Sequence, residues 1–113
     1  MVTIYHNNRC SKSRQTLELL QKQGQDVQVV PYLTQTPSRE ELREVLAKLK
    51  LAPEDIIRKG EKLYKEVYAG QHLTHDEWLQ VLTQNPILIE RPIVINGDKA
   101  VIGRPPENVL TIL

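Results

Sequence analysis

The sequence contains one cysteine, Cys10, and its neighbours are mostly polar or cationic. Arg9, Lys12 and Arg14 surround it, and His6 lies nearby in the chain. Cys10 follows a strand-like run and precedes a helical pattern, where the free backbone N–H groups and dipole of a helix start favour an anionic sulfur. A lone cysteine is commonly a small buried hydrophobe. The helix start and the cationic neighbours instead favour a reactive thiolate.

The segment from Cys10 to Ser13 has the form C-x-x-S, in which the second thiol of a dithiol redox motif is replaced by a hydroxyl. With a single cysteine, the chain has neither an internal disulfide nor a zinc site built on several thiolates. An external thiol must therefore complete any redox cycle that begins at Cys10.

The elements that position Cys10 follow a strand, helix, strand pattern. Residues 2–5 and 27–30 are rich in β-branched side chains and predict two parallel strands. Between them, residues 11–23 predict a helix that Ser11 or Ser13 caps and Gly24 ends.

The middle of the chain is predicted to be all-helical from residue 37 to residue 85. Ser38 with Glu41, and Thr74 with Glu77, match the capping-box pattern at two helix starts, the first for a helix over 39–50. Shorter helices are predicted after Pro53 and around an apolar face formed by Leu63, Tyr64, Val67 and Tyr68.

Strand character returns near the end of the chain. Residues 93–95 and 100–102 flank Asn96-Gly97-Asp98, a strong signal for an antiparallel hairpin. After Pro105-Pro106 a last helix is predicted, with Val109, Leu110 and Leu113 as its buried stripe.

The predicted order, β-α-β then β-β-α, is that of an α/β thioredoxin-like, or glutaredoxin-like, core. A chain of 113 residues suits one domain. We expect a single domain over 1–113, with a core of 1–32 and 87–113 and a helical insertion at 33–86. In thioredoxin-like folds a cis proline precedes the third strand and faces the cysteine, and Pro92 occupies that place; most X–Pro bonds elsewhere are trans.

Several separated motifs in the right order resemble the ArsC-type arsenate reductases, which work with glutathione and glutaredoxin. The resemblance covers the whole chain and rests on Tyr5-His6-Asn7, Cys10-Ser11-Lys12-Ser13-Arg14, Arg58, Ile89-Glu90-Arg91-Pro92-Ile93-Val94 and Gly103-Arg104-Pro105-Pro106-Glu107. Two departures are Asn8, where members usually have proline, and the missing extension that some members carry after the last helix.

The resemblance implies that Cys10 is the nucleophile and that His6 assists thiolate formation. It further implies that Arg58, Arg91 and Arg104 bind the oxyanion. Guanidinium groups suit this role because they donate paired hydrogen bonds to a tetrahedral anion while staying charged. Supporting positions are implied for Asn7, Ser13, Arg14 and Pro92.

The implied substrate is arsenate and the implied product arsenite. Cys10 attacks arsenic(V), glutathione supplies electrons as a co-substrate, and glutaredoxin resolves the mixed disulfide between Cys10 and glutathione. No bound cofactor and no metal are expected. His72 and His75 have a spacing that suggests a metal site, but Thr74 caps a helix between them and no third ligand is evident.

Composition argues against other partners. Fifteen basic and fourteen acidic side chains give a net charge of +1, so no global field attracts nucleic acid or an anionic membrane. No apolar stretch reaches the roughly 20 residues of a membrane span. The polar start of the chain does not match a signal peptide, and we expect a cytoplasmic protein.

Two alternatives remain open at this stage. One is a regulatory binding protein similar to the Spx-type regulators, which share this fold and grip RNA polymerase. Those regulators typically carry a C-x-x-C switch and lack the arginine at the Gly103-Arg104-Pro105 position. The other is a thiol oxidoreductase of the same fold that acts on another oxyanion or on a glutathionylated protein.

Overall fold

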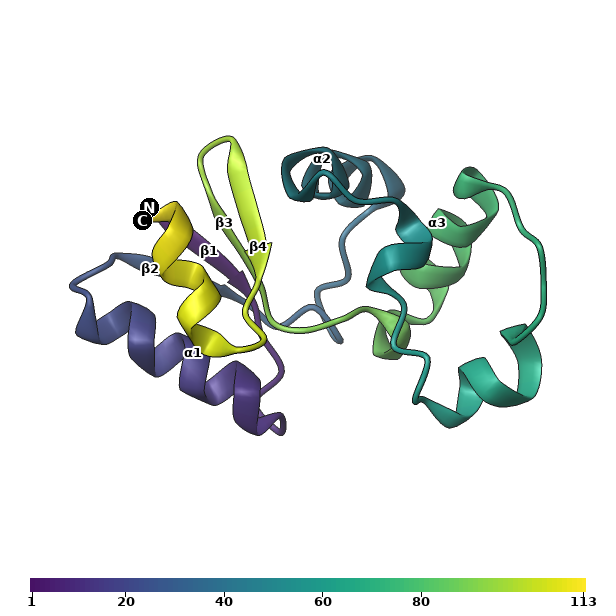
Figure 1. The fold of residues 1–113 in the computed structure, drawn as a ribbon, viewed down its shortest axis with the longest axis horizontal. Helices are drawn as coiled ribbons and strands as arrows, with labels where there is room; N and C mark the ends of the chain where they lie inside the picture. Colours follow the sequence, from purple (N-terminus) through teal and green to yellow (C-terminus); the bar gives the residue numbers. More distant parts are fainter. The chain divides into compact units, whose positions relative to one another are not determined.

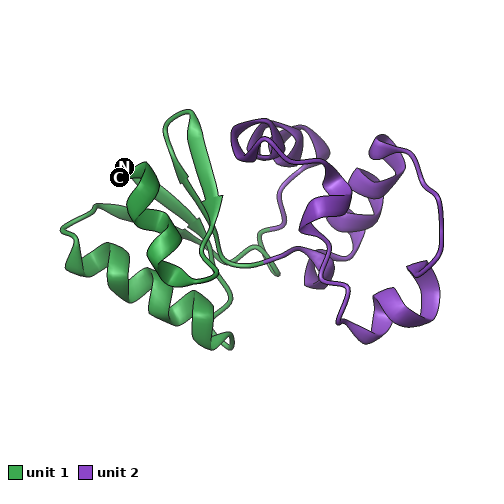
Figure 2. Cartoon of the chain, in the orientation of Figure 1, with its two compact units in different colours: residues 1–35, 91–113 green, residues 36–90 purple.

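Residues 1–113 are all described by a computed structural model (Figure 1). The chain forms two units, one of residues 1–35 and 91–113 and the other of residues 36–90 (Figure 2). The first unit holds the sheet and Cys10, and the second is helical. No helix combines the length and the apolar character that crossing a membrane requires.

The first unit contains a four-stranded sheet with the strand order β2-β1-β3-β4. Strands β1 and β2 are parallel, whereas β3 is antiparallel to both of its neighbours. This arrangement confirms the predicted thioredoxin-like fold. The strands span Val2–Tyr5 (β1), Val27–Val30 (β2), Ile93–Asn96 (β3) and Lys99–Ile102 (β4).

Helix α1, Ser11–Lys22, connects β1 to β2. It ends before Gly24, whose φ of 73° is the left-handed conformation predicted for the stop. The predicted cap was wrong, because Cys10 itself is the N-cap. The Cys10 backbone is extended and its carbonyl accepts the first helical hydrogen bond, from Arg14 N–H.

A hydrophobic core lies between one face of the sheet and two helical segments of the same unit. Val2, Ile4 and Val94 supply the sheet side, and Leu20 of α1 packs against them. Segment η4, Pro106–Ile112, completes the core (Figure 1). This core fixes α1, and with it Cys10, to the strands.

Segment η4 corrects the predicted last helix. It is a 3₁₀-helix, which has three residues per turn, so its buried side chains recur at every third position: Pro106, Val109 and Ile112. Leu110 and Leu113, which an α-helical stripe would bury, are 46% and 41% exposed. The segment is helical as predicted, but its buried positions follow the three-residue period of a 3₁₀-helix and not the period of an α-helix.

The second unit begins with helix α2, where the capping box of Ser38 and Glu41 is confirmed. Its buried side chains are Leu42, Val45 and Leu46 from α2 and Trp78, Leu79 and Leu82 from α3. Its elements are α2 (Arg39–Leu49), η1 (Pro53–Ile56), η2 (Tyr64–Tyr68), α3 (His75–Gln84) and η3 (Pro86–Leu88). Segment η2 is a π-helical turn with no buried residue, so its predicted apolar face is wrong, and Val67 is 48% exposed.

The capping box at the start of α3 is expected to stabilise the fold in a pH-dependent way. Thr74 accepts the Glu77 N–H and Glu77 accepts the Thr74 N–H. Hydrogen bonds from the backbone and side chain of Thr74 lower the pKa of Glu77. Because that pKa is lower in the folded state, the stabilisation is present at neutral pH and is lost as pH falls through the folded-state pKa.

We expect Thr74→Ala to lower the free energy of unfolding by about 1 kcal/mol at neutral pH, because the α3 N-cap loses its side-chain acceptor. Urea denaturation at pH 7 measures this loss. Thr36→Ala, a change at an exposed threonine, is the control. Equal stability of the two variants would show that the cap contributes nothing.

Candidate active site

The strand register gathers several predicted site segments at one end of the sheet. Tyr5, the last residue of β1, pairs with Ile93, the first residue of β3, and Ile93 pairs with Ile102, the last residue of β4. Three segments therefore lie at the same end of the sheet: the loop that follows Tyr5, the residues that precede Ile93 and the residues that follow Ile102. These three segments carry Cys10, Arg91 and Arg104.

Cys10 is a partly exposed residue with a free thiol at the start of α1. The thiol makes no capping hydrogen bond, so the sulfur does not use the free N–H groups of the first helical turn. These N–H groups and the helix dipole stabilise negative charge at this position. The arrangement suits both a thiolate and an anion bound beside it.

A buried hydrogen-bond network holds the loop that leads to Cys10. Ser13 is fully buried; its Oγ lies 2.7 Å from His6 Nδ1 and accepts the Asn7 N–H at 3.1 Å. Asn7 Oδ1 accepts the Arg9 N–H, and the Asn7 carbonyl accepts the Cys10 N–H, each at 3.0 Å. The network is internal to the loop and the first turn of α1, so it fixes the position of Cys10.

His6 is joined to Ser13 and forms no hydrogen bond with Cys10. Ser13 Oγ already accepts the Asn7 N–H, and its own proton can then be donated to His6 Nδ1. In that arrangement the neutral imidazole carries its proton on Nε2. The geometry gives His6 a role in holding the loop, and its assistance to the thiolate stays a prediction.

Arg14 acts on the same loop from outside. Its Nη1 donates to the Asn8 carbonyl at 2.9 Å, and both residues are exposed. Asn8 is the loop position at which the sequence resemblance led us to expect proline. The Arg14 side chain thus restrains the backbone at the position where the rigid proline ring is missing.

Arg91 has hydrogen-bonding capacity that the protein does not use. Its Nε and Nη1 atoms are buried and make no hydrogen bond. Buried polar groups are nearly always paired, so an unpaired guanidinium is an unusual feature that needs an explanation. A tetrahedral oxyanion would satisfy both nitrogens.

Arg91 and Arg104 both precede prolines, and the Arg91–Pro92 and Arg104–Pro105 peptide bonds are both cis. The cis Arg91–Pro92 bond agrees with the expectation from thioredoxin-like folds. The Gly103 N–H donates to the Pro92 carbonyl at 2.9 Å and joins the two segments. Arg104 is exposed, so its side chain is free to reach a ligand from solvent.

Arg58 lies in the helical unit and has acidic partners there. Its Nη1 forms an ion pair with Glu61, and its Nε lies 3.8 Å from Glu90 Oε1. The Arg58 N–H donates to the Leu88 carbonyl. Its predicted role in oxyanion binding stays a prediction.

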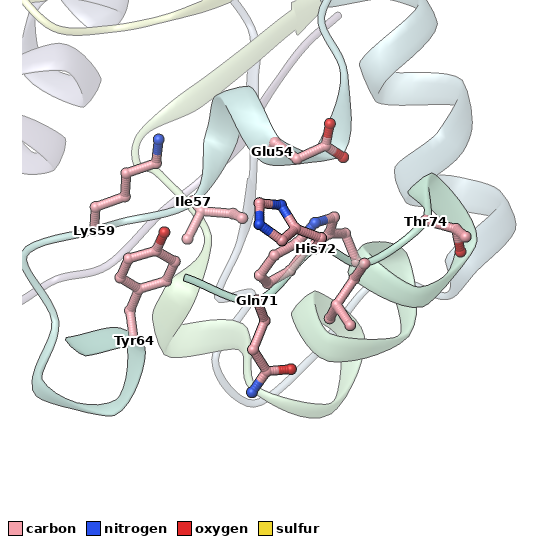
Figure 3. Close-up of a pocket in the computed structure, with 9 residues that line it drawn as sticks. Glu54, Ile57, Lys59, Tyr64, Gln71, His72 and Thr74 are labelled. Atoms are coloured by element: carbon pink, nitrogen blue, oxygen red, sulfur yellow. The ribbon is translucent and has the colours of Figure 1, made fainter. Parts of the chain in front are cut away.

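The helical unit contains a separate cavity of about 370 Å³, which Figure 3 shows. His72 projects into the middle of the view, with Glu54 and Tyr64 on different sides of it (Figure 3). His75 does not line this cavity, and its Nε2 lies 3.4 Å from Glu54 Oε2. No three His, Cys, Asp or Glu side chains come close enough together to hold a metal ion.

Sequence reasoning did not identify Thr16, which is fully buried on α1 and contacts the Gly103 segment. The available signal was its spacing. Ser13 and Thr16 are three residues apart, so they share one face of the helix.

The arrangement predicts that an oxyanion protects Cys10. Saturating sulfate should slow alkylation of Cys10 by iodoacetamide about tenfold or more, because the bound anion covers the sulfur. The rate is measured by mass spectrometry, with sodium chloride at matched ionic strength as the control. Equal rates in sulfate and chloride would show that no anion binds at the thiol.

Comparisons with known proteins agree with this architecture. A model of the ArsC family matches residues 5–112. An arsenate reductase of Haemophilus influenzae is 45% identical, with 99% of this chain and 98% of the relative covered. An arsenate reductase of Escherichia coli is 39% identical over 99% of this chain and 80% of its own length.

The fold comparison gives the same result. The solved structure of an arsenate reductase from Vibrio cholerae has a TM-score of 0.95 and 47% identity, with 99% of this chain and 97% of that chain covered. Both the sequence and the structure match over nearly the full length. The chain with Cys10 at its helix start therefore belongs to the ArsC family.

Proposed function

We propose that this chain reduces arsenate to arsenite at Cys10, with glutathione and glutaredoxin as electron donors. The observation that carries the proposal is the placement of Cys10 and Arg91 at one end of the sheet. The thiol lies at a helix N-terminus, and the two buried nitrogens of Arg91 lack partners. Membership of a family with relatives named arsenate reductase supports arsenate as the oxyanion.

In the proposed first step, the Cys10 thiolate attacks arsenic(V) and forms a sulfur–arsenic bond. One arsenic–oxygen bond breaks, and that oxygen leaves as hydroxide, which takes a proton from solvent to become water. A negatively charged sulfur and a negatively charged substrate repel each other. Arg91 and Arg104 offset this repulsion by donating hydrogen bonds to the arsenate oxygens. The backbone N–H groups at the start of α1 carry partial positive charge and also stabilise the anion.

In the second step, the glutathione thiol supplies the remaining reducing equivalent. Two thiols, those of Cys10 and glutathione, become one mixed disulfide, and the two electrons reduce arsenic(V) to arsenic(III). Arsenite leaves the site. Cys10 is partly exposed, which favours the approach of glutathione.

An external thiol must then regenerate the enzyme, because Cys10 is the only cysteine in the chain. Glutaredoxin attacks the mixed disulfide, takes the glutathione and releases the Cys10 thiol. The C-x-x-S sequence is consistent with this route, since Ser13 is engaged with His6 and has no sulfur to offer.

A coupled assay tests the proposal. Oxidation of NADPH is followed with arsenate, glutathione, glutathione reductase and glutaredoxin, and in parallel with thioredoxin and its reductase. We expect arsenate-dependent turnover in the first mixture only. Turnover with thioredoxin alone would overturn the proposed donor, and no turnover in either mixture would overturn the proposed substrate.

A further inference from the structure

Thr16 has an unusual environment for a helical threonine. It is fully buried, and its Oγ1 lies 2.8 Å from the Lys12 carbonyl and 3.2 Å from the Gly103 carbonyl. Thr16 has a single hydroxyl proton, which the two carbonyls share. The contact with Lys12 is the local one that any helical threonine can make to the preceding turn. The bond to Gly103 spans 87 positions of the sequence and joins α1 to the segment after β4.

Gly103 fits this place only because it has no side chain. A Cβ at Gly103 would lie 2.9 Å from Pro92 Cγ and 2.9 Å from both Cγ2 and Oγ1 of Thr16. Carbon atoms in real structures essentially never approach that closely. The backbone of the Gly103 segment therefore packs directly onto the threonine and the proline.

Gly103 also forms hydrogen bonds in two directions. Its N–H donates to the Pro92 carbonyl at 2.9 Å, and its carbonyl accepts from Thr16. Arg91 precedes Pro92 and Arg104 follows Gly103. One residue thus connects the backbones that carry both arginines to the helix that carries Cys10.

We propose that Thr16 is a positioning residue for oxyanion binding: its hydroxyl, through Gly103, holds the backbones of Arg91 and Arg104 in register with Cys10. The inference rests on the proposed function for its substrate. Ser13 fixes the preceding loop from the same face of α1. The helix is then a common frame, with one buried hydroxyl for the cysteine loop and a second for the arginine segments.

The alternative is that Thr16 merely fills space in the core. The two accounts predict opposite orders for two substitutions. Thr16→Val keeps the shape and removes the hydroxyl, whereas Thr16→Ser keeps the hydroxyl and removes the methyl group. If Thr16 only fills space, the serine variant should have the lower kcat/KM for arsenate. If Thr16 positions the arginine segments, the valine variant should have the lower kcat/KM.

The kinetic test measures arsenate reduction by wild type, Thr16→Val and Thr16→Ser. We expect kcat/KM for arsenate to fall by about 10- to 100-fold in the valine variant, because misplaced arginines bind the oxyanion poorly. The serine variant should stay within about threefold of wild type. Thr83→Val is the matched control, since Thr83 Oγ1 donates only to the Gln80 carbonyl of its own helix.

The alkylation rate of Cys10 distinguishes an effect on oxyanion binding from a change in the cysteine loop itself. In Thr16→Val the rate without anion should match wild type, because Ser13 still holds the cysteine loop. Protection by sulfate should weaken in the valine variant and persist in the serine variant. A change in the rate without anion, with sulfate protection intact, would overturn the proposal. If Thr16→Val does not fold, Thr16→Ala against Thr16→Ser provides the same contrast.

A third measurement does not depend on the substrate. Hydrogen exchange of the Gly103 amide, followed by NMR, should accelerate in Thr16→Val and stay close to wild type in Thr16→Ser and Thr83→Val. Unchanged exchange together with unchanged kinetics would overturn the positioning role. If wild type does not reduce arsenate while exchange and sulfate protection respond as expected, the proposed substrate fails and the positioning role stands.

Discussion

Cys10→Ser should lose arsenate reduction by roughly a thousandfold or more in kcat, because the hydroxyl cannot form the sulfur–arsenic bond or the mixed disulfide. The variant should remain folded. Cys10 is the N-cap of α1, and serine is a favoured residue at that position. The coupled NADPH assay measures the activity, and circular dichroism measures the fold.

One control variant and one binding measurement support this test. Ser11→Ala changes an exposed neighbour on the same turn and should keep its activity. Sulfate should still bind to Cys10→Ser, because Arg91, Arg104 and the helix start are unchanged, and calorimetry measures this binding. Residual turnover in Cys10→Ser at more than a few per cent of wild type would place the chemistry elsewhere.

Arg91→Ala should lower kcat/KM for arsenate by on the order of 100-fold or more, with the fold intact. Its Nε and Nη1 atoms are buried hydrogen-bond donors without acceptors, and a bound oxyanion would supply those acceptors. Arg91→Lys keeps the charge but loses the paired donors of the guanidinium, and it should recover only part of the activity. Steady-state kinetics over a range of arsenate concentrations measures both variants.

Arg104→Ala should also lower kcat/KM for arsenate. Arg104 follows Gly103, whose N–H donates to the carbonyl of Pro92, the residue after Arg91, so both arginines lie in connected segments. Arg39→Ala, a change at an exposed arginine at the start of α2, is the matched control and should leave the kinetics unchanged. An Arg91→Ala protein that is unfolded, or that keeps wild-type kinetics, would show that the guanidinium serves structure alone.

The strand pattern was predictable from sequence because it depends on local signals. β-Branched residues mark β1 and β2, and Gly97 with its φ of 63° marks the turn of the hairpin. The capping boxes at α2 and α3 are equally local, since each needs only a hydroxyl and a carboxylate three residues apart. These signals were enough to predict the thioredoxin-like fold.

The period of the last helix was not predictable in the same way. Val109 serves as a buried residue in both an α-helical and a 3₁₀-helical stripe, so it cannot separate them. The structure buries Ile112 and exposes Leu110, in agreement with the tighter turn of a 3₁₀-helix. Segment η4 packs against α1 and β4, and such tertiary contacts leave no local signal in the sequence.

The candidate site was predictable in its residue types and not in its connections. Cys10 stands out as a lone thiol among cations, and Arg91 and Arg104 stand out by resemblance to a family. The hydrogen bond of Ser13 to His6 and that of Thr16 to Gly103 link groups that sequence alone does not bring together. Threonine and serine are common on helices, so only the fold reveals which hydroxyls matter.

The most direct test of the central claim is the mass of the intact protein after a single turnover. The protein is mixed with arsenate and glutathione in the absence of glutaredoxin, and then acid-quenched. We predict that one glutathione is attached, that peptide mapping places it on Cys10, and that it is absent when arsenate is left out. An unmodified Cys10 in a protein that reduces arsenate, or glutathione attached equally without arsenate, would contradict the account.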